Sequence, residues 1–192
     1  MVCGKLTFIS GGVRSGKSAY AEKLLVKKAS GGRLVYIASG TATDLEMENR
    51  IKQHQVDRSE FNWKTLEQPT RLEEVLPFIQ PGDLVLWDCL TTWLANELYV
   101  GWETGTPCIA QSGCMERKAE ELHKTIELIL ATVSQLVIVS NEVLDDLQPT
   151  DEETETYRKW LGEIHQKLVA RAHTAIEMEY SIPIYWKGED AG

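Results

Sequence analysis

Gly11-Gly-Val-Arg-Ser-Gly-Lys-Ser18 is the stretch that decides the fold of this chain. A glycine followed by four residues and then Gly-Lys-Ser is the pattern of a phosphate-binding loop. Before it, Leu6-Thr-Phe-Ile9 is a short apolar run typical of a buried strand, and after it residues 19–29 favour a helix. An ordinary glycine-rich turn is the alternative, but strand, glycine loop and helix in this order favour phosphate binding.

The residue types of this loop suit a polyanionic ligand. Its glycines let the backbone approach phosphate closely, and the helix N-terminus that follows favours an anion. We expect Lys17 to contact the β- and γ-phosphates of a nucleotide and Ser18 to hold Mg²⁺. The predicted nucleotide-binding residues of the loop are Gly11, Gly12, Val13, Arg14, Ser15, Gly16, Lys17 and Ser18.

The composition is that of a globular chain with a substantial core. With 192 residues, 43% of them hydrophobic and 26% charged, we expect one domain spanning residues 1–192. The net charge of −9 argues against a general nucleic-acid or anionic-membrane binder, because both need a basic surface. No apolar run reaches membrane-spanning length and no signal-peptide pattern is present, so we expect a cytoplasmic protein.

The cysteines carry no metal-binding pattern. None of them forms a C-x-x-C pair, so free thiols in a reducing compartment are expected, with a metal site as the less favoured alternative. The four cysteines are Cys3, Cys89, Cys108 and Cys114.

Strand and helix patterns alternate along the chain. Further strands are predicted at residues 33–38, 61–66, 83–88, 135–140, 174–178 and 182–186. Helices are predicted at residues 43–58, 71–78, 91–99 and 115–133, and after a capping box formed by Thr150 and Glu153. Residues 101–113 are polar and glycine-rich, which indicates a loop, and Pro183 suits an edge strand. The pattern predicts an α/β fold: a mostly parallel sheet with helices on both faces and an edge hairpin near the C-terminus.

Ligands of such sheets bind beyond the carboxyl ends of the strands. Besides the phosphate loop, residues 39–43, 88–92 and 140–144 follow predicted strands. Asp88 ends an apolar strand, and we expect it to hold Mg²⁺ together with Ser18, helix capping being the alternative. Glu67 is either an acceptor for a sugar hydroxyl or a guanine N–H, or simply an exposed acid.

One histidine has a context that favours catalysis. Arg50, His54 and Arg58 share one stripe of the predicted helix 43–58, which suits a polyanion. A neutral imidazole is a good nucleophile, and its phosphorus adduct can donate the group in a second step. The alternative is a solvated basic face with a bystander histidine. The other histidines, expected to be structural or exposed, are His123, His165 and His173.

The motifs together resemble the bifunctional adenosylcobinamide kinase/adenosylcobinamide-phosphate guanylyltransferase family. The resemblance covers nearly the whole chain in order, starting with a loop of the form GGxRSGKS. The further stretches that resemble the family's motifs are Tyr36-Ile-Ala-Ser39, Glu48-Asn-Arg-Ile-Lys-Gln-His54, Trp63-Lys-Thr-Leu-Glu67, Asp88-Cys-Leu-Thr-Thr-Trp-Leu-Ala-Asn96 and Ser140-Asn-Glu-Val143.

The resemblance implies a P-loop NTPase-like fold, a homotrimer and a transferase of cobalamin biosynthesis. Such an enzyme phosphorylates the aminopropanol hydroxyl of adenosylcobinamide with ATP or GTP. It then transfers GMP from GTP through a GMP-histidine intermediate, giving adenosylcobinamide-GDP and pyrophosphate. The histidine matches His54, which with Lys17 is the implied catalytic pair. The further nucleotide-binding residues are Ala38, Ser39, Gly40, Arg50, Glu67 and Asp88.

The sequence departs from the family after Val143. The family pattern there is Gly-x-Gly-x-Val-Pro, whereas this chain has Leu144-Asp-Asp-Leu-Gln-Pro149. Two alternatives to the bifunctional enzyme stay open. One is a GTP-binding regulatory or partner protein without corrinoid turnover, and the other is a P-loop small-molecule kinase that lacks guanylyl transfer.

Overall fold

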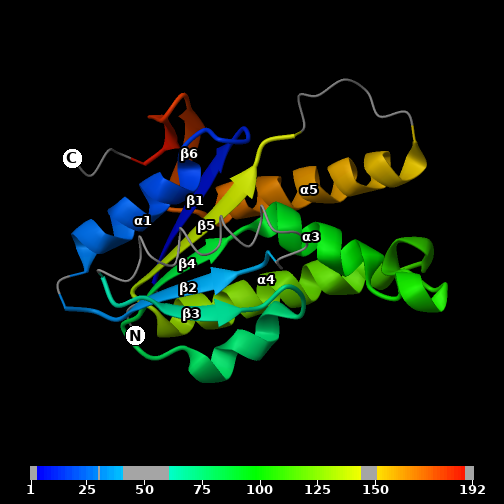
Figure 1. Ribbon diagram of the computed structural model, residues 1–192, viewed down its shortest axis with the longest axis horizontal. Helices are drawn as coiled ribbons and strands as arrows, with labels where there is room; N and C mark the ends of the chain where they lie inside the picture. The colour runs from blue at the N-terminus through cyan, green and yellow to red at the C-terminus, as the bar shows by residue number, and fades with distance from the viewer. Residues whose placement is uncertain (1–3, 30, 41–60, 144–150, 189–192) are drawn as a thin grey trace, which may run out of the picture.

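The computed structural model describes residues 4–29, 31–40, 61–143 and 151–188 (Figure 1). Its strands are β1 (Lys5–Gly11), β2 (Leu34–Ala38), β3 (Lys64–Glu67), β4 (Leu84–Asp88), β5 (Gln135–Asn141), β6 (Thr174–Glu179) and β7 (Ile182–Lys187). Its α-helices are α1 (Lys17–Lys28), α3 (Leu90–Tyr99), α4 (Cys114–Thr132) and α5 (Glu152–Arg171). Three 3₁₀ helices complete the described elements: η1 (Leu72–Phe78), η2 (Trp102–Thr104) and η3 (Cys108–Ala110).

All seven strands form one sheet in the order β3-β2-β4-β5-β1-β6-β7. Every neighbouring pair is parallel except β6 and β7, which form an antiparallel hairpin at the edge. The predicted α/β fold with a C-terminal edge hairpin is confirmed, and Pro183 lies in the edge strand β7. The parallel arrangement brings the carboxyl ends of six strands to the same edge of the sheet.

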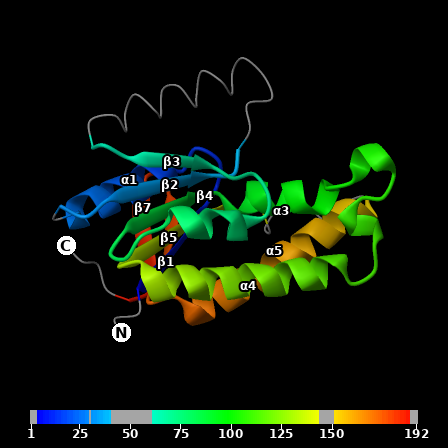
Figure 2. The same cartoon turned by 90° about the horizontal axis from the view of Figure 1, so that it is seen from below.

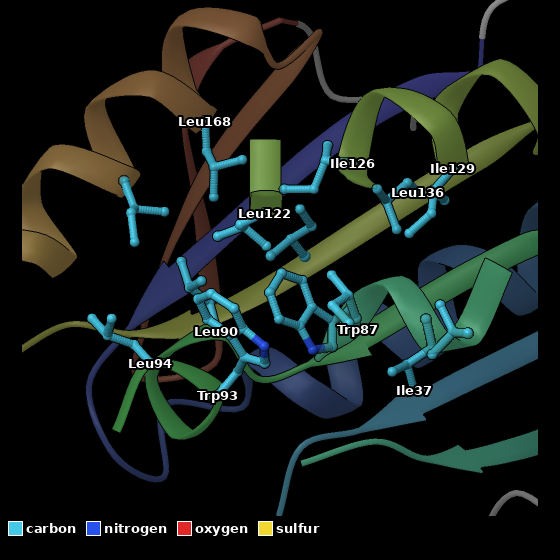
Figure 3. Close-up of a cluster of buried hydrophobic side chains, with 14 of the residues drawn as sticks. Ile37, Trp87, Leu90, Trp93, Leu94, Leu122, Ile126, Ile129, Leu136 and Leu168 are labelled. Atoms are coloured by element: carbon cyan, nitrogen blue, oxygen red, sulfur yellow. The ribbon is translucent and has the colours of Figure 1, made fainter. Parts of the chain in front are cut away.

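Helices cover both faces of the sheet (Figures 1 and 2). On one face α1 contributes Ala21 and Leu25 to a buried cluster. On the other face α3, α4 and α5 enclose a larger core, in which Trp87 of β4 meets Trp93 of α3 edge to face, with ring centroids 5.9 Å apart. Figure 3 shows Leu90 and Leu94 of α3 in the same cluster as Leu122 and Ile126 of α4. This packing fixes α3 directly behind the end of β4.

Several predicted boundaries need correction. In place of the predicted helix 71–78, Leu72–Phe78 form a 3₁₀ helix containing Pro77, whose missing N–H prevents a regular α-helical ladder. The cap of α5 is Asp151, whose side chain accepts a hydrogen bond from Thr154 N at 2.7 Å, so Asp151 rather than Thr150 opens the helix. The predicted short helix is thus present as a 3₁₀ helix, and the predicted long helix is present with a different capping residue. The predicted helix 43–58 lies outside the described residues.

The segment between α3 and α4 differs more from its prediction. It contains η2, η3 and a disulfide between Cys108 and Cys114, whose Cα atoms are 5.5 Å apart. The prediction of free thiols is therefore wrong for these two residues, because the short η3 turn brings both side chains into contact in the core. Cys89 is a free, buried thiol, and Cys3 lies outside the described residues.

In the part of the chain that the structure describes, no helix has the length and apolar character needed to cross a membrane.

A substitution in α3 tests the core. Leu94 is fully buried, whereas Leu128 of α4 is 46% exposed. We expect Leu94→Ala to lower the free energy of unfolding by about 2–5 kcal/mol, because it removes a packed side chain and leaves a cavity. The matched Leu128→Ala change should cost less than about 1 kcal/mol. Urea unfolding followed by tryptophan fluorescence measures both, and equal costs would contradict this assignment of the core.

The buried His165 predicts a pH dependence of stability. Its Nε2 lies 2.7 Å from the Ser140 hydroxyl, and burial lowers the pKa of His165 to about 4. The folded state keeps the ring neutral while the unfolded state takes up a proton below its pKa near 6.5. Stability is therefore fully present well above pH 6.5 and falls as the pH drops towards 4, by about 2.5 kcal/mol at pH 4.5. His165→Gln should flatten this slope in urea unfolding, and an unchanged slope would argue against a neutral buried ring.

Candidate functional site

The phosphate loop connects β1 to α1 and has the backbone that its sequence predicts. Gly16 has φ 87° and caps the helix, and Arg14 has φ 60°. Lys17 is 7% exposed, and its Nζ donates a hydrogen bond to Gly12 O at 3.0 Å. The side chain thus turns back over the loop and brings its charge to the place where backbone N–H groups converge on an anion.

Two glycines of the loop stand where a side chain cannot fit. A Cβ on Gly11 would lie 2.5 Å from Met178 O, and one on Gly16 would lie 2.7 Å from Ser181 Oγ. Ser181 also donates its N–H to Ser15 O at 3.0 Å. The β6–β7 turn, at Tyr180 and Ser181, is therefore the support on which the phosphate loop rests.

Ser15 carries a further sign of a ligand site. Its hydroxyl oxygen is buried and has no hydrogen-bond partner among the described residues. Such groups are rare in folded proteins unless water or a ligand satisfies them. A Cβ on Gly12, in contrast, would meet nothing within 4 Å, so the space above the loop is open.

The strand pairing arranges the other predicted residues in one row. Along the carboxyl edge, Glu67 pairs with Ala38, Ala38 with Asp88, and Asp88 with Val139, two residues before Asn141. Asn141 in turn pairs with Gly11 at the start of the phosphate loop. Adjacent strands lie about 4.8 Å apart, so the row from Gly11 to Glu67 is about 19 Å long.

Asp88 lies where the sequence predicts it, at the end of β4. The carboxylate is half-buried and accepts a hydrogen bond from the Tyr36 hydroxyl at 3.1 Å. Ser18, in the first turn of α1, is also half-buried. A hydroxyl and a carboxylate oxygen are the donor types that Mg²⁺ prefers, so the chemistry of these two residues fits that ion.

Ser39 has a different environment from the one that a nucleotide contact suggests. It is 0% exposed, its N–H donates to Asp88 O at 3.0 Å, and its hydroxyl accepts from Trp87 Nε1 at 2.8 Å. Its neighbours Ala38 and Gly40 are half-buried, and Glu67 is exposed. The buried Ser39 thus anchors this loop to β4, while Ala38 and Gly40 form the accessible part of the loop.

Sequence reasoning placed residues 140–144 at the ligand-binding edge but assigned no single residue there; the end of β5 lies between the phosphate loop and Asp88. Glu142 donates its N–H to Gly11 O at 2.8 Å, and Asn141 donates from Nδ2 to Thr91 Oγ1 at 3.0 Å. The Tyr157 hydroxyl in α5 donates to Thr91 O at 3.2 Å, and burial raises the pKa of Tyr157. The signal was present in Ser140-Asn-Glu-Val143, but only the strand order shows that this stretch adjoins both Gly11 and Asp88.

Two groups of predicted residues remain outside this geometry. His54 and Arg50 belong to residues 41–60, and the altered stretch Leu144–Pro149 to residues 144–150; both segments lie outside the described residues.

Comparisons with known proteins identify relatives over nearly the full chain. It is 33% identical over 182 residues to the bifunctional adenosylcobalamin biosynthesis protein CobP of Pseudomonas aeruginosa, covering 94% of this chain and 96% of the relative. It is 31% identical over 170 residues to the bifunctional adenosylcobalamin biosynthesis protein CobU of Escherichia coli, covering 88% and 92%. The Salmonella typhimurium CobU protein is 30% identical over 172 residues, covering 87% and 91%.

A solved structure supports the fold. A prototypical ATPase from the type III secretion system of pathogenic bacteria superposes with a TM-score of 0.54 at 14% identity. The likeness covers 91% of this chain and 51% of that ATPase. At this identity the likeness shows the fold alone, which is P-loop NTPase-like.

The family model described as cobinamide kinase / cobinamide phosphate guanyltransferase matches residues 7–185, from β1 into β7. It spans the phosphate loop, Asp88 and the β6–β7 turn that supports the loop. The chain therefore belongs to the cobinamide kinase / cobinamide phosphate guanyltransferase family.

Proposed function

We propose that this chain, a transferase of cobalamin biosynthesis, phosphorylates adenosylcobinamide and then transfers GMP from GTP to the product. One observation carries the proposal most directly: the phosphate loop and the acids Asp88 and Glu67 lie along the same edge of the sheet. An extended nucleoside triphosphate can cover a row of about 19 Å. The family match and the relatives named above support the two reactions.

In the kinase step the aminopropanol hydroxyl attacks the γ-phosphorus of ATP or GTP. The new O–P bond forms as the bond to the β-phosphate oxygen breaks, the nucleoside diphosphate leaves, and the hydroxyl proton passes to water. Lys17 and the loop N–H groups stabilise the charge that develops on the phosphate oxygens. In this proposal Lys17 exchanges its present hydrogen bond to Gly12 O for the phosphates.

Ser18 and Asp88 are the residues that would hold Mg²⁺. When bound, the ion neutralises charge on the β- and γ-phosphates. Tyr36 orients the Asp88 carboxylate by donating to one of its oxygens.

In the guanylyl-transfer step a ring nitrogen of His54 attacks the α-phosphorus of GTP. The N–P bond forms as the bond to pyrophosphate breaks, with Arg50 offsetting charge on the departing group. A phosphate oxygen of adenosylcobinamide phosphate then attacks the same phosphorus, the N–P bond breaks, and adenosylcobinamide-GDP is released. This step rests on the match of His54 to the family motif.

Glu67, Ala38 and Gly40 are proposed to bind the nucleoside end of GTP. Glu67 is exposed at the end of β3, so its carboxylate is accessible to a ligand. Guanine presents two neighbouring N–H donors that a carboxylate accepts together, whereas adenine lacks this pair. The carboxylate therefore favours GTP in the second step.

Covalent labelling tests the histidine intermediate. Protein mixed with Mg²⁺ and α-labelled GTP should retain acid-labile, base-stable label after denaturation, because the phosphorus is bonded to nitrogen. His54→Ala should abolish the label, and the control His123→Ala, in α4, should keep it.

The opposite outcome is equally informative. If wild-type protein binds GTP in calorimetry and takes up no label, the histidine mechanism is wrong for this chain. The choice then narrows to a P-loop kinase without guanylyl transfer or a GTP-binding partner protein, which the altered stretch Leu144–Pro149 favours.

A second test concerns the lysine of the phosphate loop. We expect Lys17→Met to lower kcat/KM of the kinase step by about 10²–10³-fold, because it removes the positive charge that stabilises the transferred phosphate. Lys23 lies exposed on the same helix, and Lys23→Met serves as the matched control. A Lys17→Met enzyme within about threefold of wild type would contradict the role given to Lys17.

A further inference from the structure

We propose that Asn141, at the end of β5, donates a hydrogen bond to the γ-phosphate of the bound nucleoside triphosphate, and that Thr91 of α3 orients its amide. Because a triphosphate must lie along the row of strand ends for this role, it rests on the proposed function. Asn141 belongs to the stretch Ser140-Asn-Glu-Val143, to which the two proposed reactions give no part.

Asn141 lies between the phosphate loop and Asp88, because β5 is the strand between β1 and β4 (Figure 1). It pairs with Gly11 at the start of the loop, while Asp88 pairs with Val139, two residues earlier in β5. With strands about 4.8 Å apart and a rise of about 3.3 Å per residue, the Cα atoms of Asn141 and Asp88 are about 8 Å apart. Asn141 is half-buried, so a ligand at this edge can reach it.

The groups on either side of Asn141 are those assigned to the terminal phosphates. Lys17 holds its charge over the loop, with Nζ 3.0 Å from Gly12 O, and the lysine of such a loop contacts the β- and γ-phosphates. On the other side, Asp88 is proposed to hold the ion that neutralises the same two phosphates. A γ-phosphate placed between these groups lies over the end of β5, where Asn141 is the last residue of the strand.

Hydrogen bonds to Thr91 fix the Asn141 amide. Thr91 Oγ1 accepts from Asn141 Nδ2 at 3.0 Å and from the Asn141 backbone N–H at 3.3 Å. A hydroxyl oxygen accepts two hydrogen bonds, so the Thr91 proton is left for Cys89 Sγ, 3.1 Å away. Thr91 itself is 4% exposed, and its carbonyl accepts from the Tyr157 hydroxyl. Thr91 therefore presents a rigid acceptor to the Asn141 side chain.

The Asn141 amide keeps a donor for a ligand. Its Nδ2 carries two hydrogens, and one of them is donated to Thr91. Within the described part of the chain, the structure shows no acceptor for the second hydrogen. An amide N–H that meets a phosphate oxygen makes a charge-assisted hydrogen bond. A nucleoside diphosphate lacks that oxygen, so Asn141 favours the triphosphate substrate over the diphosphate product.

Binding of AMP-PNP and ADP measures this preference, since AMP-PNP has a γ-phosphate and ADP has none. We expect Asn141→Ala to lower the AMP-PNP/ADP affinity ratio by about 10–100-fold, because one hydrogen bond to a charged group is lost. The dissociation constant of ADP should stay within about threefold of wild type. Isothermal calorimetry with Mg²⁺ present gives each constant.

Thr91→Val tests the orienting role, because it keeps the shape of the side chain and removes the hydroxyl. The AMP-PNP/ADP ratio should fall by more than about threefold, and Thr91→Val should change it no further once Asn141 is replaced by alanine. Thr91→Ser restores the hydroxyl and should restore the ratio. Thr125→Val is the matched control, because Thr125 is a threonine of α4 that is 3% exposed.

The outcomes separate recognition of the γ-phosphate from a structural bridge between β5 and α3. A folded Asn141→Ala variant with a lower melting temperature and an unchanged AMP-PNP/ADP ratio would overturn the role of Asn141. If this variant fails to fold, Asn141→Leu, which keeps the volume of the side chain, and Thr91→Val decide on the same ratio. Wild-type protein that binds AMP-PNP and ADP equally would also overturn the role, whereas wild-type protein that binds neither would overturn the proposed function itself.

Discussion

The parallel pairing of β5 with both β1 and β4 is the constraint on which the site depends. It sets Gly11 beside Asn141 and Asp88 beside Val139, so the phosphate loop and the acid of β4 are separated by one strand. A slip of one residue in the pairing of β4 with β5 would turn the side chains of β4 to the opposite face and move Asp88 out of the row. The burial of Leu136 and Ile138 on one face of β5 and Val137 and Val139 on the other opposes such a slip.

Helix α3 orders the loops that follow these strand ends. It begins directly after β4, and its buried side joins the large core through Trp93 and Leu94. Its polar groups reach in three directions: Thr91 to Asn141 at the end of β5, Asn96 to Ser39 after β2, and Asn96 again to Pro69 after β3. The same short helix therefore combines a hydrophobic anchor with the hydrogen bonds that order the loops around it.

The sequence predicted those features that depend only on residues close together in the chain. The glycine loop, the apolar strand before it and Asp88 at a strand end are all patterns within a few residues, and the hairpin with Pro183 is as well. What it missed depends on residues far apart in the chain. Ser39 is an internal residue because Trp87, 48 positions later, donates to its hydroxyl. Neither the order of the strands nor the approach of Cys108 to Cys114 follows from spacing alone, because both are set by tertiary packing.

The support of the phosphate loop by the β6–β7 turn has a consequence for the order of events during synthesis. The loop is synthesised long before its supports, because β1 pairs with β5 and β6 and Ser181, which donates to Ser15 O, follows both. A nascent chain that has not yet reached residue 181 lacks the turn that supports its phosphate loop. The phosphate loop therefore gains its full support only after the β6–β7 turn has been synthesised.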